Sequence, residues 1–200
     1  MERTELIIVA GTVVTAAYMV ARWWQQQQTD ALDVAEPAAT EPGDATSLLE
    51  DTMATIKTYL GLWRPPAKYA VMIAAAEDRY GLPRDMLARL LWQESHYRED
   101  IITGRTTSPV GALGIAQFMP ATARDMGIDP LDPAQAIDGA GRYLARMYRA
   151  TGSWSQALAA YNWGIGNVQR RGLDQAPAET RNYFTQILAD VNAANGTTLT

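Results

Sequence analysis

Apolar positions after residue 65 recur at helical spacing, and glycines and prolines punctuate the helices that they predict. Gly81 and Gly152 supply C-terminal stops, and Asp132 with Pro133 opens the longest predicted helix. No segment alternates apolar and polar residues as a half-buried strand does. The pattern therefore predicts an all-α domain over residues 65–200, with helices over residues 66–80, 83–97, 133–151, 153–161 and 178–194 and a further one beginning near Pro120.

A different pattern occupies the first 24 residues. Leu6 to Ala21 contains no charged residue and is followed by Arg22, Trp23 and Trp24. This stretch would span roughly 24 Å as a helix, and the two tryptophans would extend it as an interfacial anchor. We interpret residues 1–24 as a membrane segment. A cleaved signal peptide is the alternative, although the start of the chain lacks a basic region.

Residues 25–64 form a second compositional block. Between Gln25 and Asp51 there are seven acids and no base, which predicts a solvated, self-repelling tether. A glutamine-rich binding segment is the alternative interpretation. From Thr46 to Leu60 apolar residues recur at helical spacing, which predicts an amphipathic helix before the domain of residues 65–200.

The amino-acid composition limits the kinds of catalytic or metal site that the chain can form. The chain has no cysteine and one histidine, which excludes a disulfide framework and disfavours a metal centre or a Ser-His triad. Residues 1–64 hold nine acids and four bases, whereas residues 65–200 hold thirteen of each, so the net charge of −5 lies entirely in the N-terminal third. An acidic chain does not suit a nucleic-acid partner. We expect no cofactor and no metal, and catalysis by carboxylates, hydroxyls or amides.

One carboxylate stands on an apolar helix face. With Leu90 as the reference, Leu87 lies at about 60° and Glu94 at about 40°, so Glu94 projects from the middle of the face. Burial raises the pKa of a carboxyl group and keeps it protonated, as a general acid requires. The alternative is that the helix ends near Glu94 and its face becomes exposed.

A glycine-rich stretch follows this helix. Gly111 and Gly114 are three residues apart and permit close approach of the backbone to a neighbouring group, and Gln117 comes soon after them. The stretch lacks the lysine and the serine or threonine of a phosphate-binding loop. A simple turn before the next helix is the alternative.

Four short motifs then occur in order along the chain: Glu94-Ser95, Gly114-Ile115-Ala116-Gln117, Ala160-Tyr161-Asn162 and Glu179-Thr180-Arg181-Asn182-Tyr183. In order and spacing they resemble the catalytic domain of the soluble lytic transglycosylases, the lysozyme-like glycoside hydrolase family 23. The resemblance covers about residues 66–190 and implies a lysozyme-like helical fold.

The resemblance also implies a reaction. The expected enzyme cleaves the β-1,4 bond between N-acetylmuramic acid and N-acetylglucosamine in peptidoglycan without water, and leaves a 1,6-anhydro-muramyl end. Glu94 would donate a proton to the glycosidic oxygen and then accept one from the attacking C6 hydroxyl. No second acid is needed, so the nearby acids, namely Glu99, Asp100 and Asp125, are expected to be solvated surface.

Supporting roles carry over by motif position. Ser95 and Gln117 would bind the muramyl substituents or the glutamate, Tyr161 and Asn162 would line the sugar site, and Glu179 would contact substrate or hold Tyr161. Tyr183 is expected to buttress the floor. The structural alternatives are a core role for Tyr161, a helix cap for Asn162 and a helix-dipole contact for Glu179.

The sequence departs from the family at two positions. Ala116 stands where methionine is usual, and Trp163 stands where alanine usually follows the Ala-Tyr-Asn block. Trp163 and Tyr183 are therefore candidate subsite residues. Trp163 would stack on a sugar face, and packing in the core is the alternative.

Two other functions remain open. One is a muramidase that delivers water with the same fold, and the other is a non-catalytic protein that binds peptidoglycan in an assembly. In each case peptidoglycan is the expected partner, and the first 24 residues place the domain on the wall side of a membrane. Fifteen arginines against two lysines suit a bacteriophage virion protein as well as an envelope enzyme or a secretion-system accessory.

Overall fold

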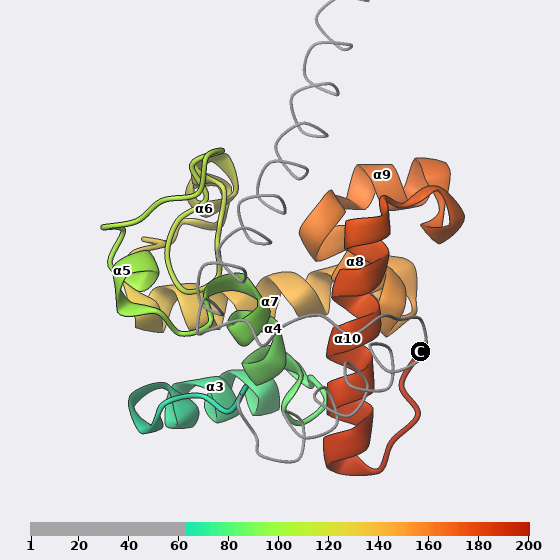
Figure 1. Cartoon of the computed structure of the whole chain (residues 1–200), viewed down its shortest axis with the longest axis horizontal. Coiled ribbons are helices and arrows are strands. Elements are labelled where there is room, and N and C mark those ends of the chain that lie inside the picture. The colour runs from blue at the N-terminus through green and yellow to red at the C-terminus, as the bar shows by residue number, and fades with distance from the viewer. Residues whose placement is uncertain (1–62) are drawn as a thin grey trace, which may run out of the picture.

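The computed structural model describes residues 63–200, which form a helical domain (Figure 1). Leu113 and Phe118 form an isolated bridge, and within this part of the chain no longer strand occurs. The predicted all-α class is confirmed. The elements are α3 (Ala67–Tyr80), α4 (Met86–Ser95), α5 (Glu99–Ile102), α6 (Pro120–Met126), α7 (Pro133–Thr151), α8 (Trp154–Trp163), α9 (Ile165–Arg171), the 3₁₀ turn η1 (Leu173–Gln175) and α10 (Ala178–Asn195).

Helix α7 runs through the middle of the domain and packs against α3 and α8 (Figure 1). Helix α8 in turn packs against α9 and α10, and α10 packs against α4. The core lies between these helices, where fully buried side chains from five segments meet: Leu90, Ile115, Leu144, Leu158 and Ile187. The arrangement brings α4 and α10, which are far apart in the sequence, into direct contact.

The ends of α7 and α8 follow from local chemistry. Asp132 caps α7 by accepting hydrogen bonds from two first-turn N–H groups, and Gly152 ends the helix in a left-handed conformation. Ser153 caps α8 by accepting from the N–H of Gln156 at 3.3 Å. The predicted bounds of α7 and the predicted start of α8 are confirmed.

Other boundaries differ from the prediction. Helix α4 is shorter than residues 83–97, because Asp85 before it and His96 and Tyr97 after it adopt left-handed backbone conformations with φ of 67°, 47° and 54°. Helix α8 continues to Trp163 and ends at Gly164. The pattern did not predict α5 and α9, which have four and seven residues.

The domain includes residues just before its expected start at residue 65. Trp63 is 3% exposed and belongs to the core cluster, and Arg64 forms an ion pair with Asp85 at 3.0 Å. The predicted membrane segment, tether and amphipathic helix lie outside the described residues. Within residues 63–200, no helix combines the length and apolar character that crossing a bilayer requires.

Candidate active site

The candidate site is centred on Glu94, near the C-terminal end of α4. Its side chain is buried, as the helical pattern predicts, with 8% of the residue exposed. The hydroxyl of Tyr183 on α10 donates a hydrogen bond of 2.6 Å to Oε1 of Glu94. This short contact joins residues that are 89 positions apart and fixes the carboxyl group against the facing helix.

The surroundings of Glu94 favour its protonated form. Burial raises its pKa to about 8, and the negative charge of Glu179 acts in the same direction, whereas the hydrogen bond from Tyr183 opposes the rise. A carboxyl group with this pKa holds its proton at neutral pH. It can donate that proton and, once ionised, its anion is stabilised by the hydroxyl of Tyr183.

Tyr161 on α8 connects this centre to the glycine-rich segment. Its hydroxyl donates to the carbonyl oxygen of Ala116 at 3.1 Å, and its ring lies 6.1 Å from that of Phe118 and 5.4 Å from that of Tyr143. Burial and the charge of Glu94 both raise the pKa of Tyr161. Tyr161 therefore packs in an aromatic cluster, as the core interpretation predicts, and it also interacts electrostatically with Glu94, as the site interpretation predicts.

Asn162 and Glu179 lie where α8 meets the start of α10. Oδ1 of Asn162 accepts a hydrogen bond from the hydroxyl of Thr180 at 2.8 Å, and Gly164 rather than Asn162 caps α8. Glu179 is in the first turn of α10, four residues before Tyr183, and is half-buried. Burial raises the pKa of Glu179 to about 7. This helix end thus presents a second titratable group to Glu94.

The close backbone approach expected at the glycines occurs at Gly114. Its φ is +74°, and a Cβ atom there would lie 1.7 Å from the carbonyl oxygen of Pro130. Gly111 also has a positive φ, +79°, but a Cβ atom there would meet nothing within 4 Å. Of these two glycines, Gly114 is the one at which the packing of two backbone segments demands glycine.

Gln117 ends this turn with an unusual backbone. Its φ is +46°, and its side-chain amide donates to the carbonyl oxygen of Gly114 at 2.9 Å. The side chain is buried, and its Oε1 has no hydrogen-bond partner within the protein. A buried acceptor without a donor is costly unless a ligand or water supplies one, so Gln117 presents an open hydrogen-bonding position.

Ser95 and Trp163 do not reach the surface of the site. Ser95 is fully buried, and its hydroxyl donates to the carbonyl of Leu91 at 3.1 Å and accepts from the N–H of Tyr97 at 3.3 Å. Trp163 is 2% exposed and belongs to the core cluster. Both side chains pack inside the protein in this structure, and the stacking of Trp163 on a sugar stays a prediction.

The three acids expected to be surface residues differ in exposure. Glu99 and Asp125 are exposed, and Glu99 is paired with Lys68. Asp100 is half-buried and pairs with Arg98 at 2.8 Å. In residues 63–200, no group of three or more histidine, cysteine or acidic side chains is arranged to hold a metal ion.

Sequence reasoning missed Arg89, which joins α4 to α10 a second time. Its guanidinium is almost wholly buried, contacts Asp190 at 2.5 Å and Gln93 at 2.8 Å, and lies over the ring of Trp92. Burial lowers the pKa of Arg89, and Asp190 opposes that change. Periodicity on α4 gives no signal for this pair, because it depends on how a helix 101 residues away is docked.

These features define a class of protein. Residues 71–184, more than half of the chain, match the family model described as the transglycosylase SLT domain. The match includes Glu94, the glycine-rich turn, Tyr161 and Tyr183. The chain belongs to this family.

Individual relatives come from phages and bacteria. The chain is 34% identical over 125 residues to a transglycosylase of Enterobacteria phage PRD1, covering 62% of this chain and 43% of the relative. It is 34% identical over 111 residues to membrane-bound lytic murein transglycosylase F 1 of Alkalilimnicola ehrlichii, covering 51% and 21%. It is 32% identical over 140 residues to peptidoglycan transglycosylase gp16 of Escherichia phage T7, covering 62% and 10%. The chain thus spans less than half the length of these relatives.

Proposed function

We propose that this protein is a peptidoglycan lytic transglycosylase that cleaves the β-1,4 bond between N-acetylmuramic acid and N-acetylglucosamine. The observation that carries the proposal is the buried carboxyl group of Glu94. Burial keeps it protonated at neutral pH, and it accepts a hydrogen bond of 2.6 Å from the hydroxyl of Tyr183. The SLT family and the relatives named as murein or peptidoglycan transglycosylases support the substrate class.

The first step uses Glu94 as a general acid. Its proton passes to the glycosidic oxygen as the bond to the muramyl anomeric carbon breaks, and positive charge develops on that ring. The carboxylate that remains is formed in a buried place, where a lone charge is costly. The hydroxyl of Tyr183 stabilises it through a charge-assisted hydrogen bond.

The second step returns the proton to Glu94. The muramyl C6 hydroxyl attacks the anomeric carbon, its proton passes to the carboxylate, and a 1,6-anhydro ring closes. The two steps consume no water and leave Glu94 as it began. This differs from the two-carboxyl arrangement of ordinary glycosidases, whose second group activates water or attacks the sugar.

The remaining residues position the sugar. Gln117 offers its unpartnered Oε1 to a donor on the substrate, such as the N–H of an acetamido group. Asn162 and Glu179 orient the reacting ring, and the charge of Glu179 helps to keep Glu94 protonated. Ser95 acts from beneath the site, by holding the end of α4 through its two backbone contacts.

We also propose a location. Residues 1–24 would anchor the chain in a membrane and residues 25–64 would tether the domain on the wall-facing side. The membrane-bound relatives support this arrangement, and the phage relatives support association with a virion as the alternative. Fractionation of cells or particles containing the full chain, beside a chain that starts at Trp63, tests the anchor. Membrane association of the shorter chain would contradict it.

Mass spectrometry of the muropeptides released from purified sacculi tests the activity. We expect products one water lighter than reducing-end species and resistant to borohydride. Glu94→Gln should lower their release by at least about 1,000-fold, because it removes the transferable proton and leaves the shape of the side chain. Asp125→Asn is the matched control, because it makes the same kind of change at an exposed acid and should leave release unchanged.

The other outcomes of this experiment assign the other two functions. Reducing-end products would identify a muramidase, in which Glu179 is the acid placed to activate water. Binding to sacculi without any release would identify a non-catalytic peptidoglycan-binding protein. Either result would replace the transglycosylase proposal.

A further inference from the structure

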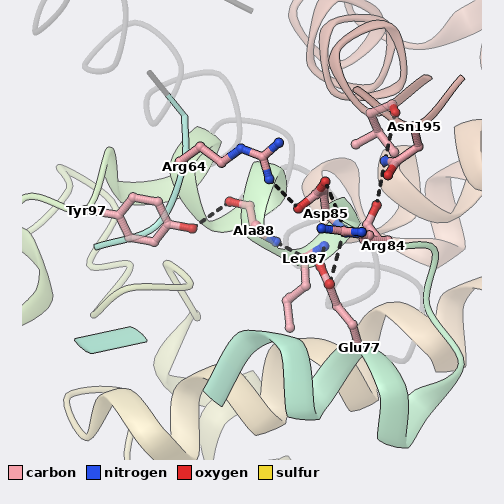
Figure 2. A network of polar contacts seen from close by, with 9 residues as sticks. Arg64, Glu77, Arg84, Asp85, Leu87, Ala88, Tyr97 and Asn195 are labelled. Carbon is pink, nitrogen blue, oxygen red and sulfur yellow. Dashed lines mark hydrogen bonds and ion pairs between the residues drawn. The ribbon is translucent and has the colours of Figure 1, made fainter. Parts of the chain in front are cut away.

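The N-terminus of α4, the helix that carries Glu94, is capped from outside the helix. Asp85 precedes the first turn with a φ of +67°, and its side chain makes no capping bond. The N–H groups of Leu87 and Ala88 instead donate to Oε1 of Glu77, at 2.9 and 3.3 Å, and the N–H of Asp85 donates to Oε2 at 3.1 Å. Figure 2 shows the Glu77 carboxylate rising from the helix below to meet this turn.

The carboxylate of Glu77 is committed to these backbone groups. Glu77 is 7% exposed and lies among the buried residues of α3. The two nearby arginines pair with Asp85, Arg64 at 3.0 Å and Arg84 at 3.9 Å (Figure 2). Burial raises the pKa of Glu77, and the N–H groups and the positive end of the α4 dipole oppose that rise by stabilising its charge.

Helix α4 can transmit a displacement at this end to Glu94. It has ten residues, and Leu87 and Glu94 are separated by roughly 10 Å of regular helix. At the other end of the helix, Glu94 accepts a hydrogen bond of 2.6 Å from the hydroxyl of Tyr183. A shift of a fraction of an ångström along or around the helix axis changes that contact directly.

We propose that Glu77 is a positioning residue for the reaction, which sets the place of Glu94 by fixing the first turn of α4 against α3. The inference rests on the proposed role of Glu94 as the acid and base. It adds a residue on a different helix, α3, which lies outside the four sequence motifs.

Other contacts keep α4 in the fold when Glu77 is changed. The hydroxyl of Tyr97 donates to the carbonyl of Ala88 at 2.7 Å, and the side-chain amide of Asn195 donates to the carbonyl of Arg84 at 3.0 Å (Figure 2). The buried pair of Arg89 with Asp190 holds the middle of the helix. We therefore expect Glu77→Gln to fold, because its remaining carbonyl oxygen can still accept from Leu87 and Ala88.

The test compares kcat and KM on sacculi well below the unfolding temperature, in the full chain. Glu77→Ala should lower kcat about 100-fold and Glu77→Gln about 10-fold, with KM within about twofold of the original value, because misplacement affects the reacting groups and leaves the sugar contacts intact. Asp78→Asn, an exposed neighbour on the same helix, controls for the change in charge. Val168→Ala, a buried residue of α9, controls for lost stability.

A purely structural role predicts a different result. Glu77→Gln and Val168→Ala would then both lower the unfolding temperature and both keep the original kcat, and that outcome would overturn the proposal. Equal kcat for Glu77→Ala and Glu77→Gln would overturn it too, since the retained oxygen would have had no effect. Cleavage by Glu94→Gln would instead remove the proposed function, whatever the Glu77 variants do.

Discussion

Two regions are linked to Tyr161 and are built in opposite ways: the contact between α4 and α10, and the glycine-rich turn from Leu113 to Phe118. In the helix contact, polar groups meet partners within the protein: Glu94 meets Tyr183, and Arg89 meets Asp190. In the turn, Gln117 has a positive φ and a buried oxygen without a partner. In the proposed mechanism, the proton-transfer groups are therefore assembled before substrate binds, whereas Gln117 keeps an acceptor for the substrate.

The largest expected effect tests whether the turn depends on its backbone. Gly114→Ala would place a Cβ atom 1.7 Å from the carbonyl of Pro130 at a φ of +74°, so one segment must move. We expect a loss of at least about 4 kcal/mol in the free energy of unfolding, measured by urea titration. Gly111→Ala is the control, with the same sign of φ and open space, and should lose about 1 kcal/mol. Equal losses at the two positions would contradict the assignment.

The next effect tests the cost of the buried acid. The folded pKa of Glu94 is about 8 against an ordinary value of 4.5, so the folded protein binds this proton more tightly than the unfolded chain. The contribution of the Glu94 proton to the free energy of unfolding is therefore fully present below about pH 4.5. It is lost as the pH rises from there through 8. Glu94→Gln should remove this loss, and be more stable than the original protein by up to about 5 kcal/mol at pH 9.

This comparison has its own control in acid. At pH 4 the carboxyl of Glu94 is protonated in both states, so the two proteins should unfold at nearly the same urea concentration. A constant difference across the pH range would mean that packing, rather than ionisation, separates them.

A smaller effect tests the hydrogen bond from Tyr183. Tyr183→Phe keeps the ring and removes the donor to Glu94, which stabilises the carboxylate formed in the first step. We expect kcat to fall about 10- to 100-fold, in line with about 1.5–3 kcal/mol for a bond to a charged group. The pKa of Glu94 should rise, which moves the alkaline limb of the pH profile upward. A limb that moves downward would contradict this role.

The smallest effect tests the open acceptor on the turn. Gln117→Met keeps the size of the side chain and removes its amide, so the substrate loses one neutral hydrogen bond worth about 1 kcal/mol. We expect KM to rise about fivefold, with kcat nearly unchanged, in turnover of a soluble glycan fragment. A fall in kcat at constant KM would mean that Gln117 acts in proton transfer, as Glu94 and Tyr183 do. The proposed difference between the helix contact and the turn would then be wrong.

Sequence reasoning predicted features that depend on neighbouring residues. The cap at Asp132 and the stops at Gly81 and Gly152 are local, and the burial of Glu94 follows from one turn of helical spacing. The motif resemblance supplied Gln117, Tyr161 and Glu179 as candidates, and the structure brings Tyr161 and Glu179 into the field of Glu94.

Other features depend on how helices dock, which spacing along the chain does not specify. The contact of Glu94 with Tyr183 joins positions 89 residues apart, and the burial of Trp163 depends on where α8 ends. Glu77 is an intermediate case. Glu77 follows Ile73 by four residues on α3, so it lies on the apolar face of that helix. The helical-spacing argument that predicted the burial of Glu94 would therefore also have predicted the burial of Glu77.

The burial of Trp63 has a mechanical consequence. A tensile load applied through the chain that precedes it would reach the hydrophobic core directly through an indole that is 3% exposed, without first stretching a surface loop. Arg64 would carry part of that load to Asp85, which directly precedes the helix that bears Glu94. A pull on the N-terminal side of the domain would therefore act on the hydrophobic core at Trp63 and, through Arg64, on the residue that precedes α4.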